Sequence, residues 1–84
     1  MIKQDIKNRT IQIARKIKNY PESYYSDNFT QALTGSVFKY KSQDLIYLFL
    51  ELQNEFGIHF CEDDVVDYKF NTLSSIVQII EKYC

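Results

Sequence analysis

Large apolar residues recur at helical spacing in three stretches of this 84-residue chain. The first stretch carries a stripe at steps of four and seven residues, made of Ile2, Ile6, Ile13, Ala14 and Ile17. Such a stripe is typical of an amphipathic helix. We therefore predict a helix over about residues 2–18, which closes before Pro21 because proline disfavours helical geometry in the residue before it.

The second stretch has the most regular pattern, with a stripe made of Leu45, Leu48 or Phe49, Leu52 and Phe56. Ser42 stands where an N-cap belongs, and Asp44 lies in the first turn, where the helix dipole favours a carboxylate. Gly57 is expected to end the helix. Ile46 and Leu50 fall beside the main stripe, so they are candidates for an exposed contact surface.

The third stretch predicts the last helix, which Asn71 would cap and which would run to about Tyr83, with a stripe made of Leu73, Ile76, Ile79 and Ile80. Before it, three acidic residues at 62–64 precede two valines, a pattern that suits a short helix. The predicted fold is therefore all-α: a four-helix bundle with a short third helix, in one domain over residues 1–84.

The connection over residues 19–41 is unusually long for a compact domain. Its aromatic and aliphatic residues indicate that it packs down onto the core. Within it, "SDNFTQAL" could form one helical turn capped by Ser26 or Asp27.

Composition limits the possible functions. A chain this short buries one core and leaves little room for a deep active site, so we do not expect an enzyme. The absence of a long apolar run or a signal-like start favours a cytoplasmic, monomeric protein that neither crosses nor binds a membrane. Residues 1–18 are basic and 43–67 acidic, but a net charge of −1 provides little drive for binding nucleic acid.

His59, Cys61 and the acids at 62–64 place five potential metal ligands close together. A zinc site would need further His or Cys ligands, and only Cys84 is left to supply one. We interpret the cluster as an acidic helix start beside a buried or half-buried Cys61, with no metal.

From Ser42 onward the chain resembles the acyl carrier proteins. In that family a serine opens the second helix, and an acidic-Phe-Gly-Ile type sequence ends it; here Ser42 is followed by "DLIYLFLELQNEFGI". Phe56 lies fourteen residues after Ser42, as the matching Phe does in the family. "EDDVVD" resembles the short third helix and "NTLSSIVQIIEKY" the fourth, and the helix order and long first loop also agree.

The resemblance implies a protein that carries rather than catalyses. Ser42 would bear a 4′-phosphopantetheine arm whose thiol holds an acyl or aminoacyl group as a thioester. A phosphopantetheinyl transferase and acyl- or peptide-processing enzymes would be its partners. Residues on the second helix would contact these enzymes, for which we select Asp44, Ile46, Tyr47 and Leu50.

The chain also departs from the family pattern. Lys41-Ser42-Gln43 replaces Asp-Ser-Leu, and Tyr47, Gln53 and Asn54 occupy acidic family positions. "LTGSVF" and "DLIYLF" resemble divergent carrier-related proteins of bacterial peptide-maturation systems. Two hypotheses follow: a modified carrier, or an unmodified protein-interaction module in which Ser42 is only a helix cap.

Overall fold

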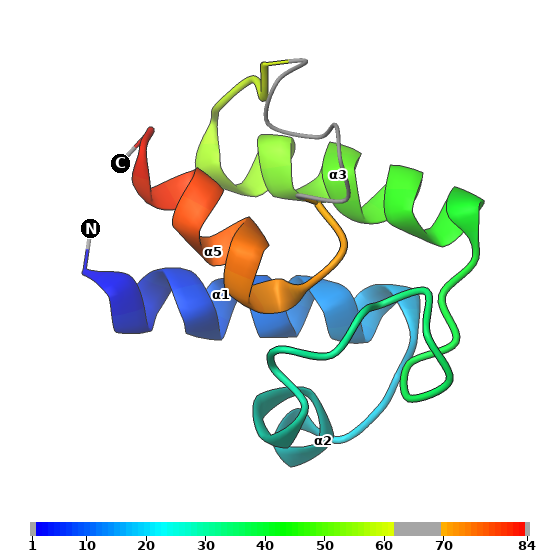
Figure 1. The fold of residues 1–84 in the computed structure, drawn as a ribbon. Coiled ribbons are helices and arrows are strands. Elements are labelled where there is room, and N and C mark those ends of the chain that lie inside the picture. The colour runs from blue at the N-terminus through cyan, green and yellow to red at the C-terminus, as the bar shows by residue number, and fades with distance from the viewer. Residues whose placement is uncertain (1, 62–69, 84) are drawn as a thin grey trace.

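The described part of the protein is all-helical. The computed structural model describes residues 2–61 and 70–83, which contain four helices and no strand. They are α1 (Lys3–Ile17), α2 (Glu22–Asp27), α3 (Ser42–Phe56) and α5 (Leu73–Glu81). This arrangement confirms the all-α prediction as a small helical bundle (Figure 1). The predicted short third helix lies outside the described residues.

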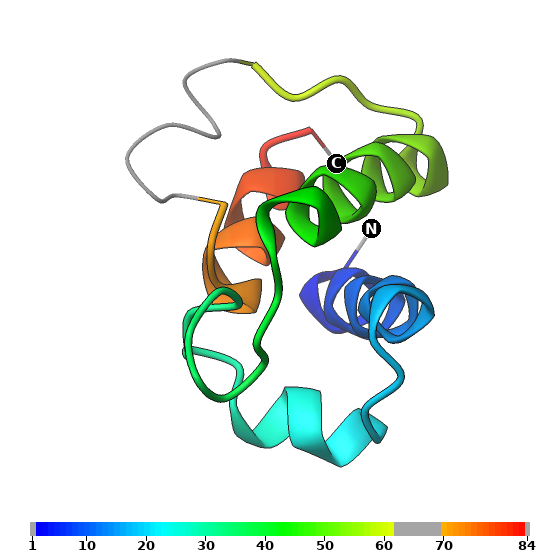
Figure 2. The same cartoon turned by 90° about the vertical axis from the view of Figure 1, so that its right-hand side faces the viewer.

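Helix α1 is the central element, since it contacts α2, α3 and α5. Helix α3 runs above α1 in the opposite direction, and α2 lies at the other side of α1 (Figures 1 and 2). The first turn of α1 meets the last turn of α5, where Lys3 Nζ lies 4.0 Å from Glu81 Oε1. The start of α3 lies at the opposite end of α1 (Figure 1).

The buried core draws on every helix and on the long loop. Its fully buried members are Ile6, Ala14, Tyr25, Leu33, Phe38, Leu48, Leu52, Leu73, Ile76 and Ile80, each with no exposed surface. Thr10 is buried among them, and its hydroxyl donates to the Ile6 carbonyl oxygen at 2.7 Å. That bond satisfies a polar group that would otherwise be costly to bury.

The predicted stripe of α1 was wrong at its first member. Ile2 is the residue before the helix and is 67% exposed, because it precedes the first turn and lies beyond the packed surface. Ile11 is buried although the prediction omitted it. The stripe of α5 is confirmed, with Val77 buried as an additional member.

Two predicted helix starts were also wrong. The short helix in the loop begins earlier than expected, after Pro21, so Ser26 and Asp27 lie inside α2 instead of capping it. Proline favours the start of a helix because its missing N–H needs no partner there.

Thr72, and not Asn71, caps α5: its hydroxyl oxygen accepts from the Ser75 N–H at 3.1 Å. Asn71 is engaged elsewhere. Its carbonyl oxygen accepts from the Leu33 N–H at 2.6 Å, and its side-chain oxygen accepts from the Thr34 hydroxyl at 3.2 Å. Asn71 thus ties the long loop to the start of α5.

Candidate functional site

The long loop reaches the start of α3 through a buried pair of tyrosines. The hydroxyl oxygens of Tyr25 and Tyr40 lie 2.8 Å apart. Tyr25 donates to the Lys18 carbonyl oxygen at 2.6 Å, and Tyr40 donates to the Ala14 carbonyl oxygen at 2.9 Å. Both acceptors belong to the last turn of α1 or follow it directly. The pair therefore fixes Tyr40, two residues before Ser42, against the central helix.

Burial keeps both phenols neutral. Loss of solvent raises the pKa of Tyr25 to about 12, although the nearby Tyr40 hydroxyl lowers it in part. Burial also raises the pKa of Tyr40, and its contact with Tyr25 raises it further. A neutral phenol has one proton to donate, so each hydroxyl can hold a backbone carbonyl at physiological pH.

Lys39 lies in the left-handed region, with φ of 58°. Its N–H donates to the Gly35 carbonyl oxygen at 2.9 Å, which closes a turn just before the chain enters α3. A residue with a side chain is disfavoured in this conformation, where glycine or asparagine is more usual. The loop thus ends with a strained lysine next to the buried Tyr40.

Ser42 is the first residue of α3, and not its N-cap as predicted. Lys41 occupies the cap position with extended geometry, and the Asp44 carboxylate accepts from the Lys41 N–H at 2.8 Å. This is half of a capping box; the lysine side chain has no acceptor with which to complete it. Because Asp44 secures the helix start, Ser42 is released from the capping role.

The Ser42 side chain is exposed. Its hydroxyl makes no hydrogen bond with any residue that the structure describes. A hydroxyl in this position can be reached by a second protein without breaking a contact of the fold. It also lies at a helix N-terminus, where a negatively charged group is stabilised by the helix dipole.

The exposed side of α3 carries the predicted apolar contacts. Ile46 is 60% exposed, Tyr47 61% and Leu50 53%. The three lie at the three- and four-residue spacing that places side chains together on one helix face. Asp44 is half-buried, and its carboxylate already accepts a hydrogen bond from the helix start. Ile46, Tyr47 and Leu50, together called the apolar ridge below, thus follow Ser42 along α3.

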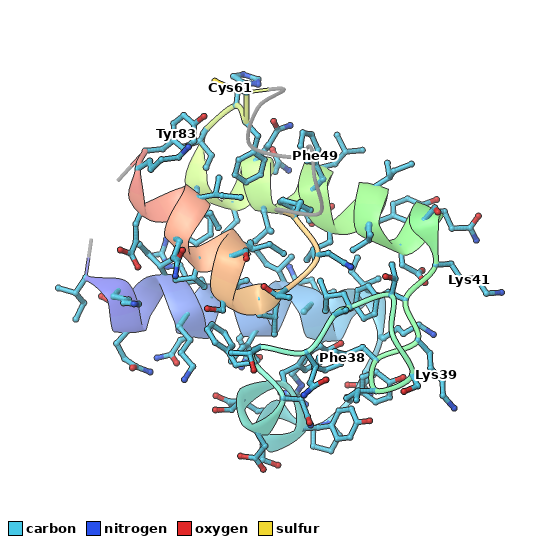
Figure 3. The ribbon with its side chains drawn as sticks, in the orientation of Figure 1. Phe38, Lys39, Lys41, Phe49, Cys61 and Tyr83 are labelled. Atoms are coloured by element: carbon cyan, nitrogen blue, oxygen red, sulfur yellow. The ribbon has the colours of Figure 1, made fainter. Side chains whose placement is uncertain are left out.

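Two cations at this end were not selected from the sequence as site residues. Lys39 and Lys41 are exposed; the Lys41 side chain extends outward where α3 begins, and the Lys39 side chain extends outward from the loop turn before it (Figure 3). Neither forms an ion pair with another described residue. The available signal was the alternation of cationic and aromatic residues in Lys39-Tyr40-Lys41.

The structure describes only part of the other candidate cluster. His59 and Cys61 are exposed, and the acids at 62–64 lie outside the described residues. The prediction of a buried or half-buried Cys61 was wrong: it lies beyond the core, where the Tyr83 hydroxyl is 3.3 Å from its Sγ. Within residues 2–61 and 70–83, no group of three potential ligands is placed to hold a metal ion.

A hollow of about 280 Å³ lies on the outer side of α5. Its lining residues are Ser75, Gln78, Ile79 and Lys82. None of them belongs to the start of α3, so this hollow is separate from the Ser42 site.

No protein-family model, curated protein or solved structure matches this chain. Among the described residues, no helix is both long and apolar enough to cross a membrane.

Proposed function

We propose that the protein is an acyl carrier-like carrier in which the Ser42 hydroxyl bears a 4′-phosphopantetheine arm. The observation that supports this most strongly is an exposed hydroxyl at the start of α3 that takes no part in capping the helix. Serine at a helix start usually serves as the cap. Here Ser42 is the first helical residue and its hydroxyl accepts no N–H of the described helix, so capping does not account for a serine at this position.

The surroundings of Ser42 suit the proposed group. The arm would join the protein through a phosphodiester, whose negative charge is favoured at a helix N-terminus and directly after Lys41. When bound, the arm supplies a thiol that carries an acyl or aminoacyl group as a thioester. The protein's own contribution is to hold the attachment point at a fixed place on a rigid helix.

A carrier must also be recognised by the enzymes that load and unload it. The apolar ridge begins one helical turn after Ser42 and is open to solvent. An exposed apolar patch of this kind marks a site of protein contact. We propose a cytoplasmic monomer that catalyses no reaction itself and uses this ridge, with Asp44 at its edge, to meet a phosphopantetheinyl transferase and acyl- or peptide-processing enzymes.

The second candidate function is an unmodified protein-interaction module. The cationic Lys41 directly before Ser42 favours it, because acidic residues beside the serine are what carrier-modifying enzymes are expected to contact. In this version Ser42 is an exposed surface residue, and not the helix cap that the sequence suggested. The apolar ridge would then dock a maturation enzyme or a peptide without a prosthetic arm.

The deciding experiment is intact-mass measurement after incubation with coenzyme A and a broad-specificity phosphopantetheinyl transferase. We expect the wild-type protein to gain one phosphopantetheine and the Ser42→Ala variant to gain none. Ser36→Ala is the matched control, because Ser36 is also an exposed serine but lies in the loop, and this variant should be loaded like the wild type. If the wild-type chain gains no mass, either with this enzyme or in its native host, the carrier proposal is wrong and the interaction module is favoured.

A further inference from the structure

Charge is distributed unevenly along the exposed side of α3. Lys41 stands at its N-terminal end, and Lys39 lies in the loop turn just before it; both side chains extend into solvent (Figure 3). The first acidic residue of α3, Asp44, is half-buried and already accepts the Lys41 N–H. The helix dipole adds a partial positive charge at the same end. The two lysines outnumber the single Asp44 carboxylate, so this end of the face carries a net positive charge.

The opposite end of the face carries the opposite sign. Glu51 is exposed one position beyond Leu50, and it forms no ion pair with another described residue. Glu55 lies further along but is turned toward α1, where its carboxylate is 3.7 Å from Arg9. From its start, the face thus presents two exposed lysines beside the half-buried Asp44 carboxylate, then the apolar ridge, and then the exposed Glu51 carboxylate.

The backbone at Lys39 gives a second reason to look for a role. A left-handed conformation is strained for lysine and would be adopted more easily by glycine or asparagine. The left-handed backbone holds a long cationic side chain outside the turn at residues 35–39, three residues before Ser42. No contact among the described residues explains the presence of lysine at this position.

We infer that the face formed by Lys39, Lys41 and the apolar ridge docks a partner protein that presents carboxylates beside an apolar patch. Carboxylates on the partner would lie against the two lysines, and its apolar side chains would cover Tyr47 and Leu50. Glu51 at the far end then fixes the direction of docking, because opposite charges at the two ends favour one orientation over its reverse. The partner of the proposed carrier is therefore acidic, not basic, where it approaches Ser42.

Two other occupants are less well supported. A stable dimer buries about 800 Å² on each subunit, which three ridge residues cannot supply, so a second copy of the chain is disfavoured. An anionic membrane would attract the lysines by only about 1 kcal/mol each and would repel Glu51. A brief contact with an acidic protein surface suits a small ridge with charges at both ends.

The inference rests on the proposed function only in placing the docking face beside Ser42, so its test uses unmodified protein. The probe is a blocked amphipathic helical peptide with leucines on one face and glutamates on the other. The matched control peptide has lysines in place of the glutamates. Binding is followed by the amide chemical shifts of the isotope-labelled full chain. Ser42→Ala should bind like the wild type, which separates failure of docking from failure of loading.

We expect saturable shifts at Lys41, Ile46, Tyr47 and Leu50 with the glutamate peptide, and about fivefold weaker binding of the lysine peptide at low salt. The preference should vanish at about 1 M salt. The double variant Lys39→Glu/Lys41→Glu should reverse it. The matched control Lys3→Glu/Lys16→Glu, which makes the same charge change on α1, should leave it intact.

Four results would overturn the inference: no saturable shift on α3, equal affinity for the two peptides, loss of the preference only in the α1 variant, or stronger binding to phosphatidylserine vesicles than to the glutamate peptide. The last result would assign the face to a membrane surface.

Discussion

Two regions of this protein use tyrosine in opposite ways. Where the long loop meets α1, the rings of Tyr25 and Phe38 stack with centroids 5.0 Å apart. The hydroxyl of every tyrosine in the loop reaches a backbone carbonyl: Tyr20 bonds Phe38, for example, at 2.7 Å. On α3, by contrast, Tyr47 is 61% exposed between two exposed aliphatic residues. The loop tyrosines stabilise the fold, whereas Tyr47 belongs to a surface that lacks a partner among the described residues.

The difference teaches that apolar content alone does not separate core from contact surface in so small a domain. What separates core from contact surface is the face of the element on which a residue lies. Tyr25 and Tyr40 find carbonyl acceptors at the C-terminal end of α1, and Tyr20 and Tyr24 find them within the loop. The ridge residues lie on the side of α3 turned away from α1. The predictions below test whether the loop tyrosines and the core stabilise the fold while the apolar ridge contributes little to stability.

The largest expected effect comes from the two faces of α3. Leu52 has no exposed surface, and Leu52→Ala should lower the free energy of unfolding by about 2–5 kcal/mol, since it leaves a cavity in the core. Leu50→Ala, two positions away and 53% exposed, should change it by less than about 0.5 kcal/mol. Urea unfolding followed by circular dichroism measures both. Equal losses for the two variants would place Leu50 in the core and remove the ridge.

High pH should weaken the tyrosine region next. The pKa of Tyr25 is about 12 in the folded protein against an ordinary value of 10, so its contribution is fully present below pH 10 and is lost as pH rises toward 12. At pH 11 the loss from Tyr25 is about 1.4 kcal/mol, and Tyr40, whose pKa is raised as well, adds to it.

Urea unfolding between pH 8 and pH 11, combined with tyrosinate absorbance, checks this expectation. Stability should fall across that range, and the absorbance change assigned by Tyr25→Phe and Tyr40→Phe should coincide with unfolding. Constant stability up to pH 11 would contradict the buried pair.

Removal of one hydroxyl should have a smaller effect. Tyr40→Phe keeps the ring in place but deletes the donor to the Ala14 carbonyl oxygen and the contact with Tyr25. That oxygen still accepts the Lys18 N–H at 3.0 Å, so no buried acceptor is left unpaired. The expected loss is about 1 kcal/mol, measured by urea unfolding. Tyr47→Phe, on the exposed ridge, serves as the control and should cost almost nothing.

The sequence predicted the helices better than it predicted their starts. Hydrophobic spacing alone indicated α1, α3 and α5, because leucine and isoleucine at this spacing gather on the one helix face that packs against a core. The exposed state of Ile46 and Leu50 was also predicted, since both fall outside the stripe of α3. Pattern could not decide between neighbouring polar residues as caps: Lys41, and not Ser42, holds the cap position of α3, and Thr72, and not Asn71, caps α5. That choice depends on which oxygen reaches a free N–H.

The site was predictable only in part, for the same reason. Ser42 and the ridge were selected from their positions along α3. The lysines were missed as site residues because exposed charges are common and spacing does not distinguish them. What sets the two lysines apart is the left-handed turn at Lys39 and the buried Tyr40 between them. Sequence spacing does not reveal this burial, because the Tyr40 hydroxyl bonds Ala14 on a distant part of the chain.

The smallest expected effect distinguishes the two residues at the start of α3. Asp44→Ala removes the carboxylate that accepts the Lys41 N–H, so it should cost about 1 kcal/mol, the usual value for losing such a cap. Ser42→Ala removes a hydroxyl that makes no bond with a described residue, so unfolding free energy should change by less than about 0.5 kcal/mol. Thermal and urea unfolding of both variants give the comparison. If Ser42→Ala cost as much as Asp44→Ala, Ser42 would have a structural role after all, and the proposal that its hydroxyl is kept for modification would lose its main support.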